Sequence, residues 1–269
     1  MAHLSADVLV LRSTPRGEHD RLITAVSAED GRICAILKGS TSMHRRELAA
    51  TEPFTWSNME FYEKNGVKWV KSASALESFY GLRYDMDKLF LAAYIADVVQ
   101  ELTGEGEHAG EILPLALNTL HLLATREGEN ARIKAAFELR AACIAGFAPD
   151  LSVCERCHAP VAGEAYLDVM NGAPICAACF GHTQQCVPLV VREDTATRRV
   201  LLPLDASALA AMSFVASADP KRVFAFRLSD AHSERVFCAA AEAYLLNHLE
   251  RGFDSLENYK KLASFATHT

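Results

Sequence analysis

Residues 154–179, CERCHAPVAGEAYLDVMNGAPICAAC, contain two Cys-x-x-Cys pairs separated by 18 residues. Two residues between cysteines let a tight turn direct both sulfurs at one ion, and Zn²⁺ takes four tetrahedral ligands. The spacing also matches the paired-cysteine pattern of known zinc sites. The sequence therefore predicts one structural zinc ion, because four thiolates leave no position open for a catalytic water. The predicted ligands are Cys154, Cys157, Cys176 and Cys179.

The segment between the two pairs favours a short β-ribbon. Residues 164–169 (EAYLDV) alternate enough for a strand, and Asn171-Gly172 is a turn signal that would return the chain toward the second pair. We therefore interpret residues 151–185 as a zinc-ribbon insertion.

Other chemistries are possible for four cysteines. Disulfides need an oxidising compartment, and a redox Cys-x-x-Cys needs a thioredoxin-like βαβ setting that the flanking sequence does not offer. An iron–sulfur cluster would also accept four thiolates. The neighbouring His158, His182 and Cys186 could each replace one of the four ligands. These alternatives stay open at the level of sequence, although the paired cysteines are favoured.

Length and composition indicate a globular protein. The chain has 269 residues, half of them apolar, which is enough for a substantial core. It contains no apolar run of membrane-spanning length and no secretory signal at its start, so we expect a cytoplasmic protein. The net charge of −7 argues mildly against a protein that only coats nucleic acid. Residues 1–80, however, hold ten basic and ten acidic residues, so the amino-terminal part is the less acidic one.

Residues 1–80 read as an all-β unit. The expected strands, 8–12, 21–27, 32–37, 52–62 and 67–77, are together rich in Val, Ile, Thr and aromatic residues. Asp30-Gly31 and Asn65-Gly66 are hairpin signatures between them. Five short strands in this length predict a small barrel, with an OB-fold as the leading choice.

From about Leu82 the apolar period changes from 2 to 3.6, which indicates helices. Asp205 and Ser229 are expected to cap two helices after the cysteines. We therefore predict a fold of α+β class: an OB-fold domain over residues 1–80, an all-α domain over 81–150 and 186–269, and the zinc ribbon inserted between its two parts.

Two basic groups in the predicted barrel are candidates for nucleic-acid binding. The segment 31–46 has no acidic residue and contains Arg32, Lys38, His44, Arg45 and Arg46, which suit phosphate contacts. The hairpin at Asn65-Gly66 carries the other candidates, Lys64, Lys68, Trp69 and Lys71, a combination that suits base stacking. The alternatives are an ordinary solvated loop and edge-strand lysines that prevent aggregation.

Catalytic motifs are absent from the sequence. There is no nucleotide-binding glycine loop, no Gly-x-Ser-x-Gly elbow and no His-Glu-x-x-His. We therefore expect a protein without enzymatic activity. The alternative is a zinc-dependent hydrolase or deaminase.

Four stretches, in this order, resemble the bacterial RecO family. They are GEHDRLITAVSAEDGRICAILKGS (17–40), Pro53-Phe54, FELRAACIAGFAPDLSVCERC (137–157) and RVFCAAAEAYLLNHLERGFDSLENYKKL (235–262). The resemblance covers essentially the whole chain. The sequence differs from the family pattern after Lys38-Gly39. The family usually has one or more arginines directly after this glycine, whereas this chain has Ser40-Thr41-Ser42 and reaches a basic pair only at Arg45-Arg46.

The resemblance implies a non-enzymatic DNA repair and recombination mediator of the RecF pathway. Such a protein would bind single- and double-stranded DNA through the OB-fold, anneal complementary strands and associate with the nucleoid. Its implied partners are RecR, the acidic tail of single-stranded-DNA-binding protein and, indirectly, RecA. The alternative is a zinc-ribbon adaptor or transcription-associated protein that makes no DNA contact of its own.

Overall fold

The computed structural model describes residues 3–39, 45–181 and 200–266 and contains two compact units. The barrel unit comprises Met1–Gly128 and Phe253–Thr269, and the ribbon unit comprises Glu129–Gly252. The chain therefore passes from one unit to the other twice.

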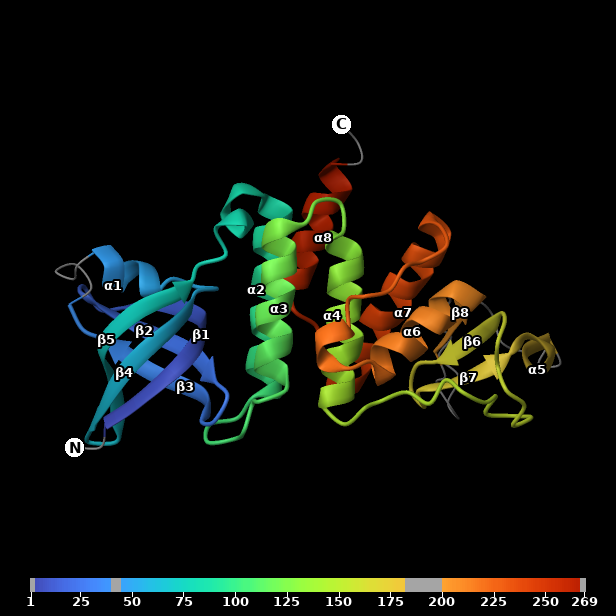
Figure 1. Cartoon of the computed structure of the whole chain (residues 1–269), viewed down its shortest axis with the longest axis horizontal. Helices are drawn as coiled ribbons and strands as arrows, with labels where there is room; N and C mark the ends of the chain where they lie inside the picture. Colours follow the sequence, from blue (N-terminus) through green and yellow to red (C-terminus); the bar gives the residue numbers. More distant parts are fainter. Residues whose placement is uncertain (1–2, 40–44, 182–199, 267–269) are drawn as a thin grey trace. The chain divides into compact units, whose positions relative to one another are not determined.

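Five strands of the barrel unit close into a barrel in the order β1-β2-β3-β5-β4, coloured blue to teal in Figure 1. They are β1 (His3–Arg16), β2 (Asp20–Ser27), β3 (Gly31–Leu37), β4 (Trp56–Lys64) and β5 (Val67–Glu77). Strands β3 and β5 pair in parallel, whereas the other neighbours are antiparallel. The predicted OB-like barrel is confirmed.

Strand β4 begins four residues later than the sequence predicted, at Trp56 instead of residue 52. The preceding residues form a turn in which the Thr55 N–H donates to the Glu52 carbonyl over 3.3 Å and Phe54 has a φ of 65°. Such backbone cannot continue a strand.

The turn between β4 and β5 sets the register of this hairpin. Asn65 and Gly66 have φ values of 54° and 73°, and this pair of positive angles matches the right-handed twist of the flanking strands. Lys64 consequently pairs with Val67, and Tyr62 pairs with Trp69.

A second glycine-containing turn fastens the barrel to the loop after helix α2 (Met86–Leu102). Gly31 has a φ of 63°, and a Cβ there would collide with the carbonyl oxygens of Gly104 and Glu107. The next residue, Arg32, donates its backbone N–H to the Gly104 carbonyl over 2.9 Å. Only glycine permits this close approach of two backbones.

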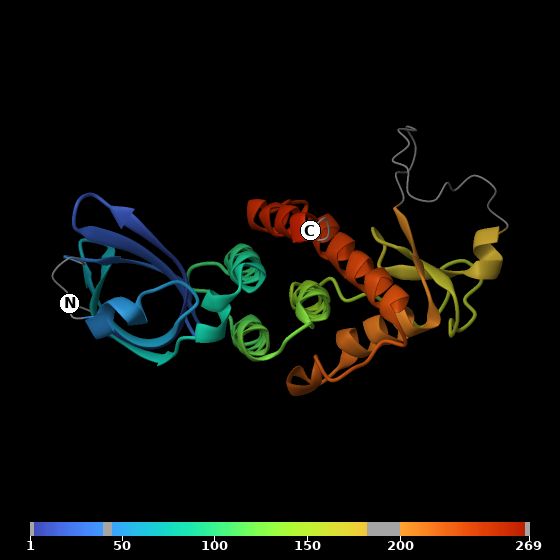
Figure 2. The same ribbon diagram turned by 90° about the horizontal axis from the view of Figure 1, so that it is seen from above.

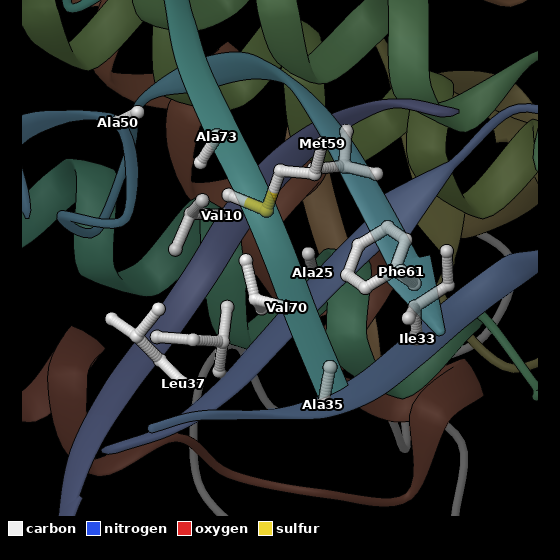
Figure 3. Close-up of a cluster of buried hydrophobic side chains, with 12 residues drawn as sticks. Val10, Ala25, Ile33, Ala35, Leu37, Ala50, Met59, Phe61, Val70 and Ala73 are labelled. Atoms are coloured by element: carbon white, nitrogen blue, oxygen red, sulfur yellow. The ribbon is translucent and has the colours of Figure 1, made fainter. Parts of the chain in front are cut away.

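One side of each strand contributes to a single apolar core, shown in Figure 3. Its strand residues are Val8, Val10, Ile23, Ala25, Ile33, Ala35, Leu37, Met59, Phe61, Val70 and Ala73. Ala50, from helix α1 (Arg45–Ala50), joins them, and its carbonyl accepts the Ser57 hydroxyl over 2.7 Å. Helix α1 accordingly lies against the barrel in Figures 1 and 2.

Three helices complete the barrel unit: α2, α3 (Ile112–Thr125) and α8 (Asp254–Ala266). Asp97 of α2 accepts one hydrogen bond from Arg12 of β1 over 2.9 Å and another from Ser255 of α8 over 2.7 Å. Tyr94 of α2 packs edge-on against Phe253, which precedes α8, with ring centroids 5.5 Å apart. These contacts join the first strand and the last helix to α2.

The ribbon unit contains the helices α4 (Asn130–Ile144), α6 (Ala206–Ser217) and α7 (Ala231–Leu249). Asp205 caps α6 as predicted. The prediction of Ser229 as the cap of α7 is wrong, because the Asp230 carboxylate accepts the N–H groups of His232 and Ser233 and Ser229 donates its hydroxyl to Asp230. Within the described residues, no helix combines the length and apolarity needed to cross a membrane.

A three-stranded sheet in the order β7-β6-β8 forms the rest of the ribbon unit. Strands β6 (Ala165–Asp168) and β7 (Ala173–Cys176) are the predicted hairpin, and helix α5 (Ala177–Gly181) follows them. Strand β8 (Leu201–Leu204) adds to the open side of β6 and was not predicted.

Helices α4 and α7 share a buried ionic cluster. The Lys134 ammonium lies 2.8 Å from a carboxylate oxygen of Glu138, one turn further along α4, and 2.8 Å from a carboxylate oxygen of Glu242 on α7. Burial lowers the pKa of Lys134, but the two carboxylates outweigh it and hold the pKa above its usual range. Lys134 therefore stays charged, and its removal would leave the fully buried Glu138 without this cation.

We expect Lys134→Met to lower the free energy of unfolding by about 3–5 kcal/mol, because breaking a buried ion pair leaves an uncompensated charge. Denaturant unfolding followed by circular dichroism measures the loss. The matched control is Lys221→Met, since Lys221 is exposed, and it should change the same free energy by less than about 0.5 kcal/mol. Equal effects of the two substitutions would contradict the role given to the cluster.

Candidate metal centre and nucleic-acid-binding surface

The four predicted metal ligands lie together. The Sγ atoms of Cys154, Cys157, Cys176 and Cys179 all lie within 4.8 Å of one another. The Cys157 and Cys176 sulfurs are 3.8 Å apart. A tetrahedral ion with metal–sulfur bonds of about 2.3 Å has sulfur–sulfur edges of about 3.8 Å. The group could therefore hold one metal ion.

The backbone around Cys154 builds a tight turn that holds this sulfur. His158, with a φ of 57°, donates its N–H to the Cys154 carbonyl over 2.9 Å and closes the turn. The Cys154 sulfur accepts backbone N–H groups from Arg156 and Cys176, each at 3.4 Å. Both groups stabilise a thiolate.

The pKa values of two of the cysteines move in opposite directions. Burial raises the pKa of Cys154, but N–H donors from Cys157, Cys176 and Arg156 outweigh it and lower the pKa to about 6. Hydrogen bonds to Cys157 and Cys176 raise the pKa of Cys179 to about 12, so that this thiol keeps its proton. A metal ion bound to all four sulfurs would displace the remaining protons, because metal-binding cysteines are deprotonated.

The positions of the sulfur atoms can be compared with the alternative ligands and with an iron–sulfur cluster. His158 is exposed and does not belong to the four-sulfur group, while His182 and Cys186 lie outside the described residues. In an iron–sulfur cluster the four cysteines are shared among two or four iron atoms, so sulfurs bound to different iron atoms lie further apart than the edges of one tetrahedron. The short spacing therefore favours a single ion.

We expect one equivalent of metal per chain, measured by elemental mass spectrometry after exhaustive dialysis. Cys154→Ser should reduce the content to near zero, because Cys154 is the buried ligand whose thiolate the backbone stabilises. Cys34→Ser is the matched control, since Cys34 lies on β3 and outside the group, and it should retain the full equivalent.

The same measurement on Cys179→Ala separates a closed site from an open one. A closed four-thiolate site should lose its metal, whereas a site with three essential ligands would retain it and would contradict the structural role.

The candidate nucleic-acid surface lies on the outside of β3, β5 and β4. Phe61 and Val70 pair with each other and face the core, so the adjacent pair Tyr62 and Trp69 faces outward. On the other side of Trp69, its parallel partner is Ile36 of β3. The rings of Tyr62 and Trp69 have centroids 6.4 Å apart and lie 16° from parallel. We call this pair of rings the barrel platform.

Lysines surround the barrel platform. Lys64 is on the same side of β4 as Tyr62, and Lys38 follows β3 on the same side as Ile36; both are exposed. Lys71 is also exposed, and its ammonium lies 3.0 Å from the Glu60 carboxylate. The platform and these cations form a surface that could contact bases and phosphates.

The other predicted residues lie elsewhere. Lys68 pairs with Glu63 and is on the core-facing side of β5, although it is only half-buried. The guanidinium of Arg32 donates to the Gln100 carbonyl of α2 over 3.1 Å, at the far end of β3 from Lys38. Arg45 and Arg46 begin helix α1, but their side chains, like the whole of His44, lie outside the described residues.

Tyr62 was not among the nucleic-acid-binding residues predicted from the sequence. Its signal was present, because counting outward from the Asn65-Gly66 turn places residue 62 opposite residue 69. The roles of all these residues in binding DNA remain predictions.

Two family models match the chain. "Recombination protein O N terminal" matches residues 1–79, and "Recombination protein O C terminal" matches residues 83–257.

Relatives with the name DNA repair protein RecO match over much of their length. The protein from Acetivibrio thermocellus is 25% identical over 262 residues, covering 97% of this chain and 98% of the relative. The one from Pelotomaculum thermopropionicum is 33% identical over 190 residues, covering 71% and 73%. The one from Anaeromyxobacter sp. strain K is 33% identical over 215 residues, covering 79% and 83%.

Proposed function

Because the chain belongs to the RecO family of DNA repair proteins, we propose that it is a recombination mediator that binds DNA through its barrel. It would bind single- and double-stranded DNA, anneal complementary strands, and help to load RecA onto DNA coated with single-stranded-DNA-binding protein. The proposal assigns the chain no reaction of its own.

The barrel platform with its lysines is the observation that carries this proposal. Aromatic rings at a surface stack on bases of any sequence, and lysines beside them neutralise phosphates and release counterions. The half-buried Tyr62 and Trp69 supply the rings, and Lys38, directly after β3, and Lys64, on β4, supply exposed cations. A binding mode of this kind does not depend on sequence, as a protein acting on any broken DNA requires.

The net charge of −7 is compatible with this mode because binding depends on the local field. Lys71 is partly neutralised by Glu60, so Lys38 and Lys64, which are both exposed, should supply most of the phosphate contact. Each neutralised phosphate changes the logarithmic salt dependence of single-strand binding by about 0.7.

We propose zinc as the metal of the four-cysteine group. Soft thiolates in a tetrahedral arrangement suit this ion, which would supply structural stabilisation and no chemistry of its own. The ribbon sheet has strands of four residues each, and so small a core needs a metal to fold.

We also propose protein partners and a cellular location for the chain. RecR and the acidic tail of single-stranded-DNA-binding protein are the proposed protein partners, and RecA is reached indirectly through them. The cytoplasm, at the nucleoid, is the proposed place of action. Family membership supports these assignments.

The test is fluorescence anisotropy with labelled single strands over a series of salt concentrations. Lys38→Ala/Lys64→Ala should weaken binding and make the logarithmic salt slope shallower by about 1.4, because two phosphate contacts are lost. The matched control, Lys221→Ala, removes an exposed lysine of the ribbon unit and should leave the slope unchanged. If the unmodified chain shows no binding at low salt, the adaptor function without DNA contact replaces this proposal.

A further inference from the structure

An exposed aromatic turn connects the barrel to helix α2. The 3-10 helix η1 (Tyr80–Tyr84) carries Tyr80, which is 62% exposed, and Tyr84, which is 87% exposed. Leu76 before it is 52% exposed and Met86 after it is 56% exposed. Four large apolar side chains within 11 residues thus face solvent, and such a concentration marks a binding surface more often than a bare surface.

Local contacts hold this turn in one conformation, so its exposed side chains do not belong to a flexible loop. Phe79 precedes it with a φ of 45°, an unfavourable value for a bulky residue, yet its own side chain is buried. The Glu77 carboxylate accepts the N–H groups of Ser78 and Phe79 over 2.9 and 3.0 Å. Backbone strain maintained by surrounding contacts is typical of functional sites.

Arg83 fixes the turn from its other side and orients one ring. Its guanidinium donates to the Ser78 carbonyl over 2.9 Å and lies 5.8 Å from the centre of the Tyr80 ring. Gly81 lies so close to Ala124 of α3 that a Cβ would collide with the Ala124 backbone. Tyr80 and Tyr84 are therefore presented on a rigid support.

This turn follows directly on strand β5. The register shift between Glu60 and Phe61 of β4 leaves Lys71 of β5 as an extra residue, and this bulge brings Ala73 into the core. Trp69 before the bulge and Ser74 after it consequently share the outer side, and they lie at most about 17 Å apart at about 3.3 Å per residue. Residues 74–77 are exposed, and a second register shift leaves Leu76 without a partner on β4. Strand β5 thus leads from the barrel platform to the exposed tyrosines.

The charges at the two ends differ. Lys38 and Lys64 are close to the barrel platform, whereas the tyrosine end carries Arg83 among Glu77, Asp85 and Asp87, and the nearby Lys88 is buried against Glu127. The tyrosine end therefore offers rings for stacking and little attraction for phosphates. Of the two forms of DNA, a single strand gains more from such a surface, because the bases of a duplex are already stacked on their neighbours.

We propose that Tyr80 and Tyr84 form a second stacking site, which binds the unpaired bases of a single strand as it leaves the barrel platform along β5. This inference rests on the proposed function, because it extends the same DNA-binding surface. It gives the chain a preference for single strands that does not depend on salt.

The test compares Tyr80→Ala/Tyr84→Ala with the unmodified chain on a 15-nucleotide thymidine strand and on a 15-base-pair duplex. The dissociation constant for the single strand should rise about fivefold or more, the effect of losing one base–aromatic stack of about 1 kcal/mol. Its salt slope should not change, and duplex binding should stay within twofold. Tyr80→Phe/Tyr84→Phe is the matched control and should bind as the unmodified chain does, because the rings remain.

The outcomes separate this inference from the proposed function. If the tyrosine-to-alanine variant binds the single strand normally while Lys38→Ala/Lys64→Ala does not, the second stacking site is wrong and the barrel surface stands. Equal weakening on duplex, or a shallower salt slope, would indicate phosphate contacts and would also overturn the stacking site. An unmodified chain that binds no DNA would overturn both. Circular dichroism of the variants checks that the fold is unchanged.

Discussion

The register of the β4–β5 hairpin determines which side chains of the barrel meet solvent. The type of turn at Asn65-Gly66 requires positive φ at both positions, and it fixes Tyr62 opposite Trp69. A shift of one residue would exchange the two faces of each strand, moving Phe61 and Val70 outward and the two stacked rings inward. The core in Figure 3 and the barrel platform are thus two results of the same constraint.

The ribbon unit is a different case, because the strands of its sheet have only four residues each. Its sulfur group depends on N–H donors supplied by the turns that place the sulfurs, as the two bonds to Cys154 show. We therefore propose a role in folding for this group, which has the most specific sequence signal in the chain. The surfaces proposed to bind DNA belong to the barrel unit, where the sequence signal is much weaker.

Features set by local chemistry could be predicted from the sequence, and features set by distant contacts could not. The turns at Asp30-Gly31 and Asn65-Gly66, the five strands and the four-cysteine group follow from neighbouring residues. The bulge beside Glu60, the bond from Arg32 to Gln100 and the pairing of β8 with β6 depend on parts of the chain remote in sequence. Nothing near Lys134 in the sequence indicated that its second partner, Glu242, would come from α7. Exposed lysines such as Lys38 and Lys64 were found as a class, but their placement around Tyr62 and Trp69 required the barrel.

The link through Asp97 has a consequence for the order in which the chain folds during synthesis. The ribosome releases the barrel strands first, but Asp97 receives its second hydrogen bond, and Tyr94 its aromatic neighbour, only from residues at 253–255. The ribbon unit is complete in sequence before those residues emerge. The first unit to begin folding is therefore the last to finish, and until then α2 exposes apolar surface that a chaperone could recognise.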